Sequence, residues 1–185
     1  MTRILPMTLD YPSWALISQR RRAHVARVAT LCMEWADAMD LSPAERARWL
    51  KAVTLHDALK SAPTKLLRDL VPDGWSVEAL LHGPAAAVRA VRDGERDGGI
   101  LDAVRYHSVG YAGWELVGQI LYLADYLEPG RSYHTPEHES LAAAVPANLP
   151  GTLRSVAVLR VAGTLAEGRP LLPETVEFWN SLVLA

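Results

Sequence analysis

Apolar residues recur along most of this chain at intervals of three or four, the spacing that places side chains on one face of an α-helix. Apolar and polar residues do not alternate convincingly anywhere, so the pattern predicts no β-strand. It favours an all-α fold built as a bundle of amphipathic helices. We expect helices over about 18–39, from 43 to near 57, around 66–70, from 83 to before 98, from 100 to near 107, and over about 114–127, 152–166 and 174–183.

Several of these helices have start and stop signals. Ser42 can cap the second helix, Pro43 suits its first position and Glu45 completes a capping box. Pro129-Gly130 stops the apolar helix that ends near Leu127, and the pair Gly98-Gly99 is expected to separate two helices. No internal repeat or linker divides the chain. We expect one domain over residues 1–185, with an N-terminal extension (1–16), a core (about 17–131) and C-terminal helices (about 137–183).

Composition and charge exclude some partners. Half of the 185 residues are hydrophobic, which is ordinary for a globular protein able to bury a core. The formal net charge of −2 provides no general basic field for nucleic acid. The one dense basic run, Arg20-Arg21-Arg22, is interpreted as the solvated start of a helix. An anionic substrate must therefore be bound by a local cluster of cations.

The single cysteine, Cys32, excludes an intramolecular disulfide, and its place in the helical pattern predicts small core filler. The tryptophans mostly share that core spacing, so packing is favoured over base stacking. No stretch approaches the roughly 20 apolar residues that span a bilayer, and residues 1–12 make a poor signal peptide. We expect a cytoplasmic protein with no membrane partner.

A histidine and an aspartate, His56 and Asp57, are adjacent near the end of an apolar, alanine-rich segment. A second aspartate, Asp125, lies inside the apolar run of residues 120–126, where a buried carboxylate without a cation would be very costly. This cost favours a ligand role for Asp125. Three more histidines lie in other predicted helical stretches: His24, His82 and His107.

These side chains could form a metal centre between helices. Neighbours on a helix point about 100° apart, so His56 and Asp57 can straddle a metal ion but cannot enclose it. His24 and Asp125 are the natural further ligands, which gives two imidazoles and two carboxylates. This set suits iron, manganese, cobalt or zinc better than calcium or magnesium. A divalent transition metal would lower the pKa of a bound water, and phosphate-ester or phosphoanhydride hydrolysis uses such a centre best.

The remaining histidines leave alternatives open. His82 and His107 could hold a second metal ion, or could bind phosphate oxygens as imidazoliums, so one or two ions remain open. His134 and His138 lie in a polar, proline-containing segment and are interpreted as surface residues.

As a set, these residues resemble the HD-domain metal phosphohydrolases, whose signature is a histidine, a His-Asp pair and a distal aspartate. Short segments narrow the resemblance to the YqeK family: HDALK (56–60), LHGP (81–84), YHSVG (106–110), LADYLEPGR (123–131), GRP (168–170) and PETV (173–176). The resemblance runs from about residue 17 to the C-terminus. Residues 123–131 are its most specific part.

The resemblance implies an HD-domain helical bundle with symmetrical bis(5'-nucleosyl)-tetraphosphatase activity, the cleavage of diadenosine tetraphosphate into two ADP with iron. It also implies roles by position: His24, His56, Asp57 and Asp125 as metal ligands, and Arg27, Lys60, His82, His107, Ser108 and Arg131 around the nucleotide phosphates. Placement agrees for two cations. Lys60 lies one helical turn from His56, and Arg131 follows a helix stop, where its guanidinium can clamp a phosphate.

We therefore predict a hydrolase in which a metal-activated hydroxide attacks phosphorus, with Asp57, Lys60, His82 and His107 as the catalytic residues. The substrate is a small nucleotide, and the C-terminal helices could pair two subunits in a homodimer. Many members of the family carry an aromatic residue at position 58 and threonine at 108. Ala58 and Ser108 therefore leave the substrate preference open. The alternatives are an HD hydrolase of a nucleoside phosphate or cyclic nucleotide, a regulator that binds nucleotide without cleaving it, and a helical scaffold with structural histidines.

Overall fold

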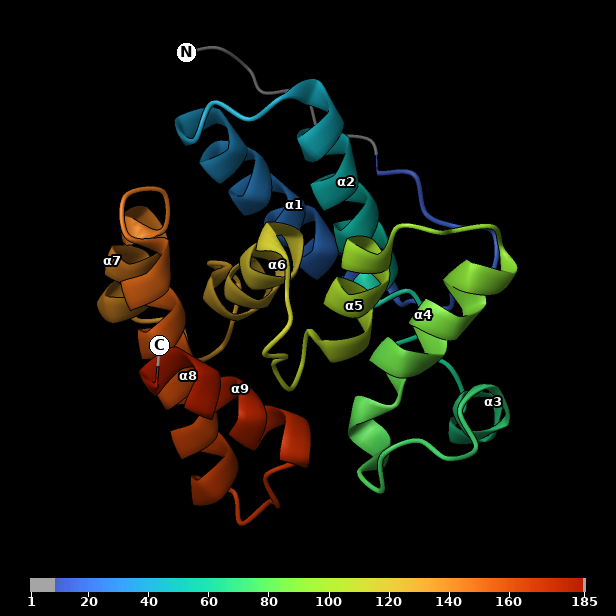
Figure 1. Cartoon of the computed structure of the whole chain (residues 1–185). Coiled ribbons are helices and arrows are strands. Elements are labelled where there is room, and N and C mark those ends of the chain that lie inside the picture. Colours follow the sequence, from blue (N-terminus) through green and yellow to red (C-terminus); the bar gives the residue numbers. More distant parts are fainter. Residues whose placement is uncertain (1–8, 185) are drawn as a thin grey trace.

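The computed structural model describes residues 9–184 and is all-helical, with no strand within that range, which confirms the predicted fold class (Figure 1). Residues 1–8, which include the first half of the expected extension and most of the segment judged a poor signal peptide, lie outside the described part. The helices are α1 (Gln19–Ala38), α2 (Pro43–His56), α3 (Thr64–Leu70), η1 (Glu78–Leu80), α4 (His82–Arg92), α5 (Gly98–Tyr106), α6 (Leu116–Leu127), α7 (Pro136–Ala144), α8 (Leu149–Ala166) and α9 (Pro173–Val183).

The apolar helix α6 is central to the packing. Nine of its twelve residues are buried, as its near-continuous run of apolar side chains predicts. It contacts α1, α2 and α5, and it also contacts α7 and α8 from the C-terminal part of the chain. Figure 1 shows α6 between these two groups of helices. A residue on α6 can therefore meet side chains from both groups.

Local signals position the helix ends near the future site. The Ser42 hydroxyl accepts a bond from the Glu45 backbone N–H at 3.2 Å, and Pro43 begins α2, as predicted. The glycine pair does not separate α4 from α5, because Gly98 and Gly99 form the first turn of α5. The chain instead turns at Gly94, whose φ of 100° is a backbone conformation that glycine adopts without strain.

The prediction missed one helix after α6. Residues 136–144 form α7, with Pro136 in its first turn and Glu137 close behind, two common features of a helix start. The interpretation of His138 as a surface residue was wrong, because its side chain is buried in the first turn of α7 and only 6% exposed. His134, in the preceding turn, is partly buried. The polar, proline-containing sequence masked a helix whose buried side is narrow.

The core confirms two further predictions. Cys32 is fully buried among apolar side chains, and Trp35 and Trp49 are also part of the core. The segment before α1 pairs with the turn after α2: the Leu16 N–H donates to the Ala58 carbonyl at 2.7 Å, and the Leu16 carbonyl accepts from the backbone N–H of residue 61 at 3.0 Å. Within residues 9–184, none of the helices combines the length and hydropathy needed to cross a bilayer.

Candidate metal centre

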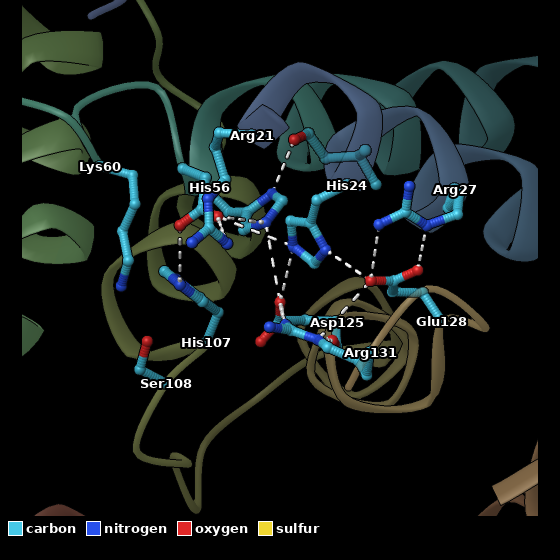
Figure 2. A network of polar contacts seen from close by, with 12 residues as sticks. Arg21, His24, Arg27, His56, Lys60, His107, Ser108, Asp125, Glu128 and Arg131 are labelled. Atoms are coloured by element: carbon cyan, nitrogen blue, oxygen red, sulfur yellow. Dashed lines mark hydrogen bonds and ion pairs between the residues drawn. The ribbon is translucent and has the colours of Figure 1, made fainter. Parts of the chain in front are cut away.

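The four predicted ligands meet at one buried place, although they come from three segments of the chain. His24 lies in the second turn of α1, and His56 is the last residue of α2, followed by Asp57 as its C-cap. Asp125 lies in the last turns of α6. Figure 2 shows His24, His56 and Asp125 converging. Lys60 and His107 lie on one flank of this group in the picture, and Glu128 and Arg27 on the other. The end of α2 positions two of the predicted ligands, because the helix ends at His56 and Asp57 follows as its C-cap.

Asp57 is the centre of the cluster, because its two oxygens face different histidines. Asp57 Oδ2 lies 3.7 Å from His24 Nε2 and 3.6 Å from His56 Nε2. Asp57 Oδ1 lies 3.2 Å from His82 Nε2 and 3.8 Å from His107 Nε2. The residues thus form two groups with metal-ligand spacing, His24–His56–Asp57 and Asp57–His82–His107, which share one carboxylate. A carboxylate in this position can bridge two ions.

Backbone carbonyls set the tautomer of three of the histidines. A carbonyl only accepts, so each Nδ1 carries a proton, and in a neutral imidazole the Nε2 then presents its lone pair to the centre. His56 Nδ1 bonds the Val53 carbonyl at 2.7 Å, His82 Nδ1 bonds the Ala79 carbonyl at 3.0 Å, and His107 Nδ1 bonds the Val104 carbonyl at 2.8 Å. Nε2 of His56 is buried and has no hydrogen-bond partner among the described residues. An orphaned lone pair of this kind fits a metal ligand.

A carboxylate orients the fourth histidine, His24, and fixes the proton on its Nδ1. Glu128 Oε1 lies 3.0 Å from His24 Nδ1, so His24 donates to Glu128 and directs Nε2 at the centre. Such a carboxylate behind an imidazole is a common support for metal-ligating histidines. Arg27 clamps the same carboxylate with its Nε and Nη2 atoms. Burial alone would raise the pKa of Glu128, but the bonds from His24 and Arg27 lower it to about 2.

The electrostatics of the cluster suit a divalent cation. Burial opposes ionisation of Asp57, but the neighbouring His56 and His82 hold its pKa well below its usual range. Burial lowers the pKa of His56 and, more strongly, that of His107, where His82 adds to the effect. Neutral imidazoles beside an ionised carboxylate form the donor set that nitrogen- and oxygen-binding transition metals prefer. The residues present therefore fit a divalent metal ion.

Asp125 lies beside the centre but is also held by two arginines. Its Oδ1 is 3.1 Å from His24 Nε2 and 4.0 Å from His56 Nε2. Arg131 bonds the same Oδ1 and the Asp125 carbonyl, while Arg160 Nη2 bonds Oδ2 at 2.8 Å. Burial would raise its pKa, but Arg131 and His24 hold the pKa of Asp125 well below its usual range. The lowered pKa favours the ionised form of Asp125, whose Oδ1 lies on the His24 side of the centre.

Three cations at the centre differ from expectation. Arg21 is not simply solvated at the start of a helix, because its Nη1 bonds Asp57 Oδ2 at 2.9 Å. Lys60 lies in the turn after α2 rather than on the helix, yet its Nζ is 3.2 Å from His82 Nε2, so it does face the site. Sequence reasoning missed Arg160 altogether. Its signal was an arginine in the otherwise apolar stretch of residues 156–161, which needs a buried anion as partner.

Sequence reasoning gave Glu128 no role either, although it lies three residues after Asp125 and is only 1% exposed. The three buried site carboxyls are therefore Asp57, Asp125 and Glu128. Arg27 and Arg131, expected near nucleotide phosphates, are each paired with one of them here. Ser108 lines a cavity that opens from the centre.

Two cavities adjoin this centre. The first, of about 510 Å³, extends from Asp57 and Asp125 towards α8. The second, of about 430 Å³, lies along α1 and includes His24 in its wall. Among the described residues that line them, each has five cationic side chains, against three acidic ones in the first cavity and one in the second. The two cavities share four wall residues: Arg21, Lys60, Arg131 and Tyr133.

The fold and the cluster define a class: all-helical proteins that bury a histidine, a His-Asp pair and a distal aspartate as a metal-type centre. The family model described as "HD domain" matches residues 21–130, and the chain belongs to the HD-domain family. A crystal structure from Clostridium acetobutylicum, described as a predicted HD superfamily hydrolase involved in NAD metabolism, aligns with a TM-score of 0.79 over 91% of each chain at 24% identity. That likeness supports the fold.

Two curated relatives narrow the similarity. The chain is 28% identical over 176 residues to the symmetrical bis(5'-nucleosyl)-tetraphosphatase of Halalkalibacterium halodurans, covering 91% of each. It is 26% identical over 175 residues to the protein of the same name from Bacillus subtilis strain 168, covering 90% of this chain and 91% of the relative. The similarity predicted from the short segments is thereby confirmed.

Proposed function

We propose that this protein is a metal-dependent phosphohydrolase that cleaves diadenosine tetraphosphate symmetrically into two ADP. The names of its relatives favour this substrate, and the buried His/Asp centre favours hydrolysis at phosphorus. Iron is the first choice of metal from the family resemblance, with manganese, cobalt or zinc as alternatives that the same donor set accepts.

The decisive structural feature is the pair of cavities that share Arg21, Lys60 and Arg131. A dinucleoside polyphosphate has two nucleoside ends joined by an anionic chain. Two cavities with common cations at their junction match that shape, with one end of the substrate in each. The concentration of cations is local, because the whole chain carries a formal net charge of −2. A mononucleotide would need only one of the two cavities.

The side chains divide the work of cleavage. His24, His56, Asp57 and Asp125 would hold one divalent ion, and Asp57 with His82 and His107 could hold a second. A metal ion bound there supplies Lewis acidity towards water and phosphoryl oxygens. Lys60 and Arg131 bind the phosphoryl oxygens and stabilise the negative charge that develops on them.

The reaction balances with water as the only second reactant. The water oxygen forms a bond to one of the two central phosphorus atoms, and the bond from that phosphorus to the central bridging oxygen breaks. The bridging oxygen leaves as the terminal oxygen of one ADP, and the water oxygen becomes part of the other. Because ADP is a good leaving group, the bond to the bridging oxygen can break without a dedicated proton donor.

The test is anaerobic incubation of iron-loaded protein with diadenosine tetraphosphate in H₂¹⁸O. The products are separated by chromatography, and their ¹⁸O content is measured by mass spectrometry. We expect ADP as the sole early product, with one ¹⁸O per pair of ADP molecules. Asp57→Asn should abolish turnover. Asp69→Asn is the matched control, since Asp69 is exposed on α3 and, within residues 9–184, forms an ion pair only with Lys65.

Other outcomes would overturn specific parts of the proposal. AMP with ATP as products would refute symmetrical cleavage. Turnover of nucleoside monophosphates or cyclic nucleotides, but not of the dinucleotide, would assign another substrate. Tight binding of the dinucleotide to iron-loaded protein without any product would assign the protein as a nucleotide-binding regulator rather than a hydrolase.

A further inference from the structure

Part of the wall of the first cavity is aromatic. Tyr126, Tyr133 and His138 all line this cavity, and their ring centroids lie 5.2–5.6 Å apart in each pairing. We call these three residues the aromatic wall. Tyr126 comes from the last turn of α6, Tyr133 from the following turn and His138 from α7. None of these three rings has a role in the metal chemistry described above.

Tyr133 is the exposed member of the wall. Its side chain is 44% exposed although it lies against two other rings, whereas His138 is only 6% exposed. His138 is fixed from behind, because its Nδ1 lies 2.7 Å from the Thr135 hydroxyl at the start of α7. The Tyr133 ring thus contacts two less exposed rings at tilted angles, 33° with Tyr126 and 48° with His138, and remains accessible. An accessible aromatic ring held by its neighbours is a surface on which a planar base can stack.

Cations adjoin the aromatic wall on the side of the metal centre. The Arg131 guanidinium carbon lies 6.0 Å from the centroid of Tyr133, and that of Arg160 lies 5.1 Å from the centroid of Tyr126. Both arginines also contact Asp125. The path from the centre outwards therefore runs from buried anions to cations and then to aromatic rings. A nucleotide offers the same order, with phosphates near the metal and a base at the far end.

We propose that Tyr133 is the stacking platform for a nucleobase of the substrate, with His138 as a positioning residue that holds the ring from behind. This rests on the proposed function only in assuming that the bound molecule is a nucleotide. Stacking on one ring tolerates any base but favours the larger purines, so the site selects purine over pyrimidine nucleotides rather than one purine over another.

Binding of products tests the proposal separately from hydrolysis. Titration calorimetry would compare ADP, UDP and pyrophosphate on metal-loaded wild-type protein, Tyr133→Ala and Tyr133→Phe. Loss of stacking is worth about 1–3 kcal/mol per base, so Tyr133→Ala should weaken ADP binding by roughly 5- to 150-fold. Pyrophosphate affinity should stay the same, and the preference for ADP over UDP should shrink. Tyr133→Phe keeps the ring and should bind ADP as the wild type does.

Tyr11 supplies a matched control. It is also a tyrosine beside an arginine, with Arg22 4.5 Å from its ring centroid, but it lies outside the residues that line the two cavities. Tyr11→Ala should leave all three affinities unchanged. The proposal would be overturned if Tyr133→Ala left ADP affinity unchanged. It would also be overturned if the substitution weakened ADP and pyrophosphate binding by the same factor. If ADP binding responds as expected while no dinucleotide is cleaved, the hydrolase assignment fails and the platform stands.

Discussion

Replacement of Glu128 by glutamine should weaken metal binding although this side chain is not a ligand. The carboxylate lies behind His24 and fixes the proton on Nδ1, which leaves Nε2 free for a metal. Its pKa, lowered from 4.5 to about 2, corresponds to about 3 kcal/mol of interaction that favours the ionised form. That interaction is distributed over His24, Arg27 and the Gly130 N–H, which donates to Oε2 at 2.6 Å.

Glutamine has nearly the same shape but no charge, so His24 would lose its charge-assisted bond. We expect the dissociation constant of the metal ion to rise by about 10- to 100-fold, the usual effect of removing a group that orients a metal-ligating histidine. Competition with a chromophoric chelator measures this constant directly. Turnover at saturating metal should change less than metal affinity does.

Glu139→Gln is the matched control, because Glu139 also contacts a histidine, His134 at 3.3 Å, but is exposed and lies outside the residues that line the two cavities. It should leave metal affinity unchanged. Circular dichroism and urea unfolding of both variants establish that each is folded. A folded Glu128→Gln protein with wild-type metal affinity would refute the assignment of His24 as a supported ligand.

Three further predictions concern stability. Gly110→Ala places a Cβ 2.3 Å from Phe178 at a φ of 95°, so it should cost about 3 kcal/mol in urea unfolding. Gly94→Ala, at a φ of 100° with no atom within 4 Å of the new Cβ, should cost only about 1 kcal/mol. Equal costs would contradict the close approach of the Phe178 ring to Gly110. Arg160→Met removes a bond to the buried Asp125 and should lower stability by about 2 kcal/mol, and an unchanged thermal midpoint would count against that ion pair. The three buried site carboxyls have folded pKa values below their unfolded ones, so they stabilise the fold above about pH 4.5 and this contribution is lost as the pH falls towards 2. The urea midpoint of metal-free protein should therefore drop between pH 6 and pH 3, and a flat profile would refute the reasoning.

Helical periodicity was enough to predict the fold class and most helices, because apolar spacing and caps such as Ser42 are local signals. Helix α7 was missed because its apolar residues are few and the segment before it is rich in polar residues and proline. Burial of His138 could not be inferred, since it depends on Tyr126 and Tyr133, which meet it only in three dimensions.

The same division applies to the site. His56, Asp57 and Asp125 were conspicuous because polar groups are costly in apolar helices, and the structure does bring them together. The roles of Arg21 and Arg160 depend on distances across the fold, 36 and 35 positions from their carboxylate partners in sequence. No local pattern in the sequence encodes such pairings. The metal-ligand roles of His56, Asp57 and Asp125 themselves stay predictions until metal binding is measured.

The residues that build and orient the metal centre extend beyond the segment that the family model matches. Residues 21–130 include all the predicted metal ligands, but Arg131 and Arg160, which hold Asp125, lie beyond that segment. Leu16, which braces the turn between Asp57 and Lys60 through its backbone, precedes it. A transplant of the family segment alone into another scaffold would therefore carry the ligands without the groups that orient them. Modular exchange among HD proteins should be planned around these outlying braces rather than around the borders of the shared sequence.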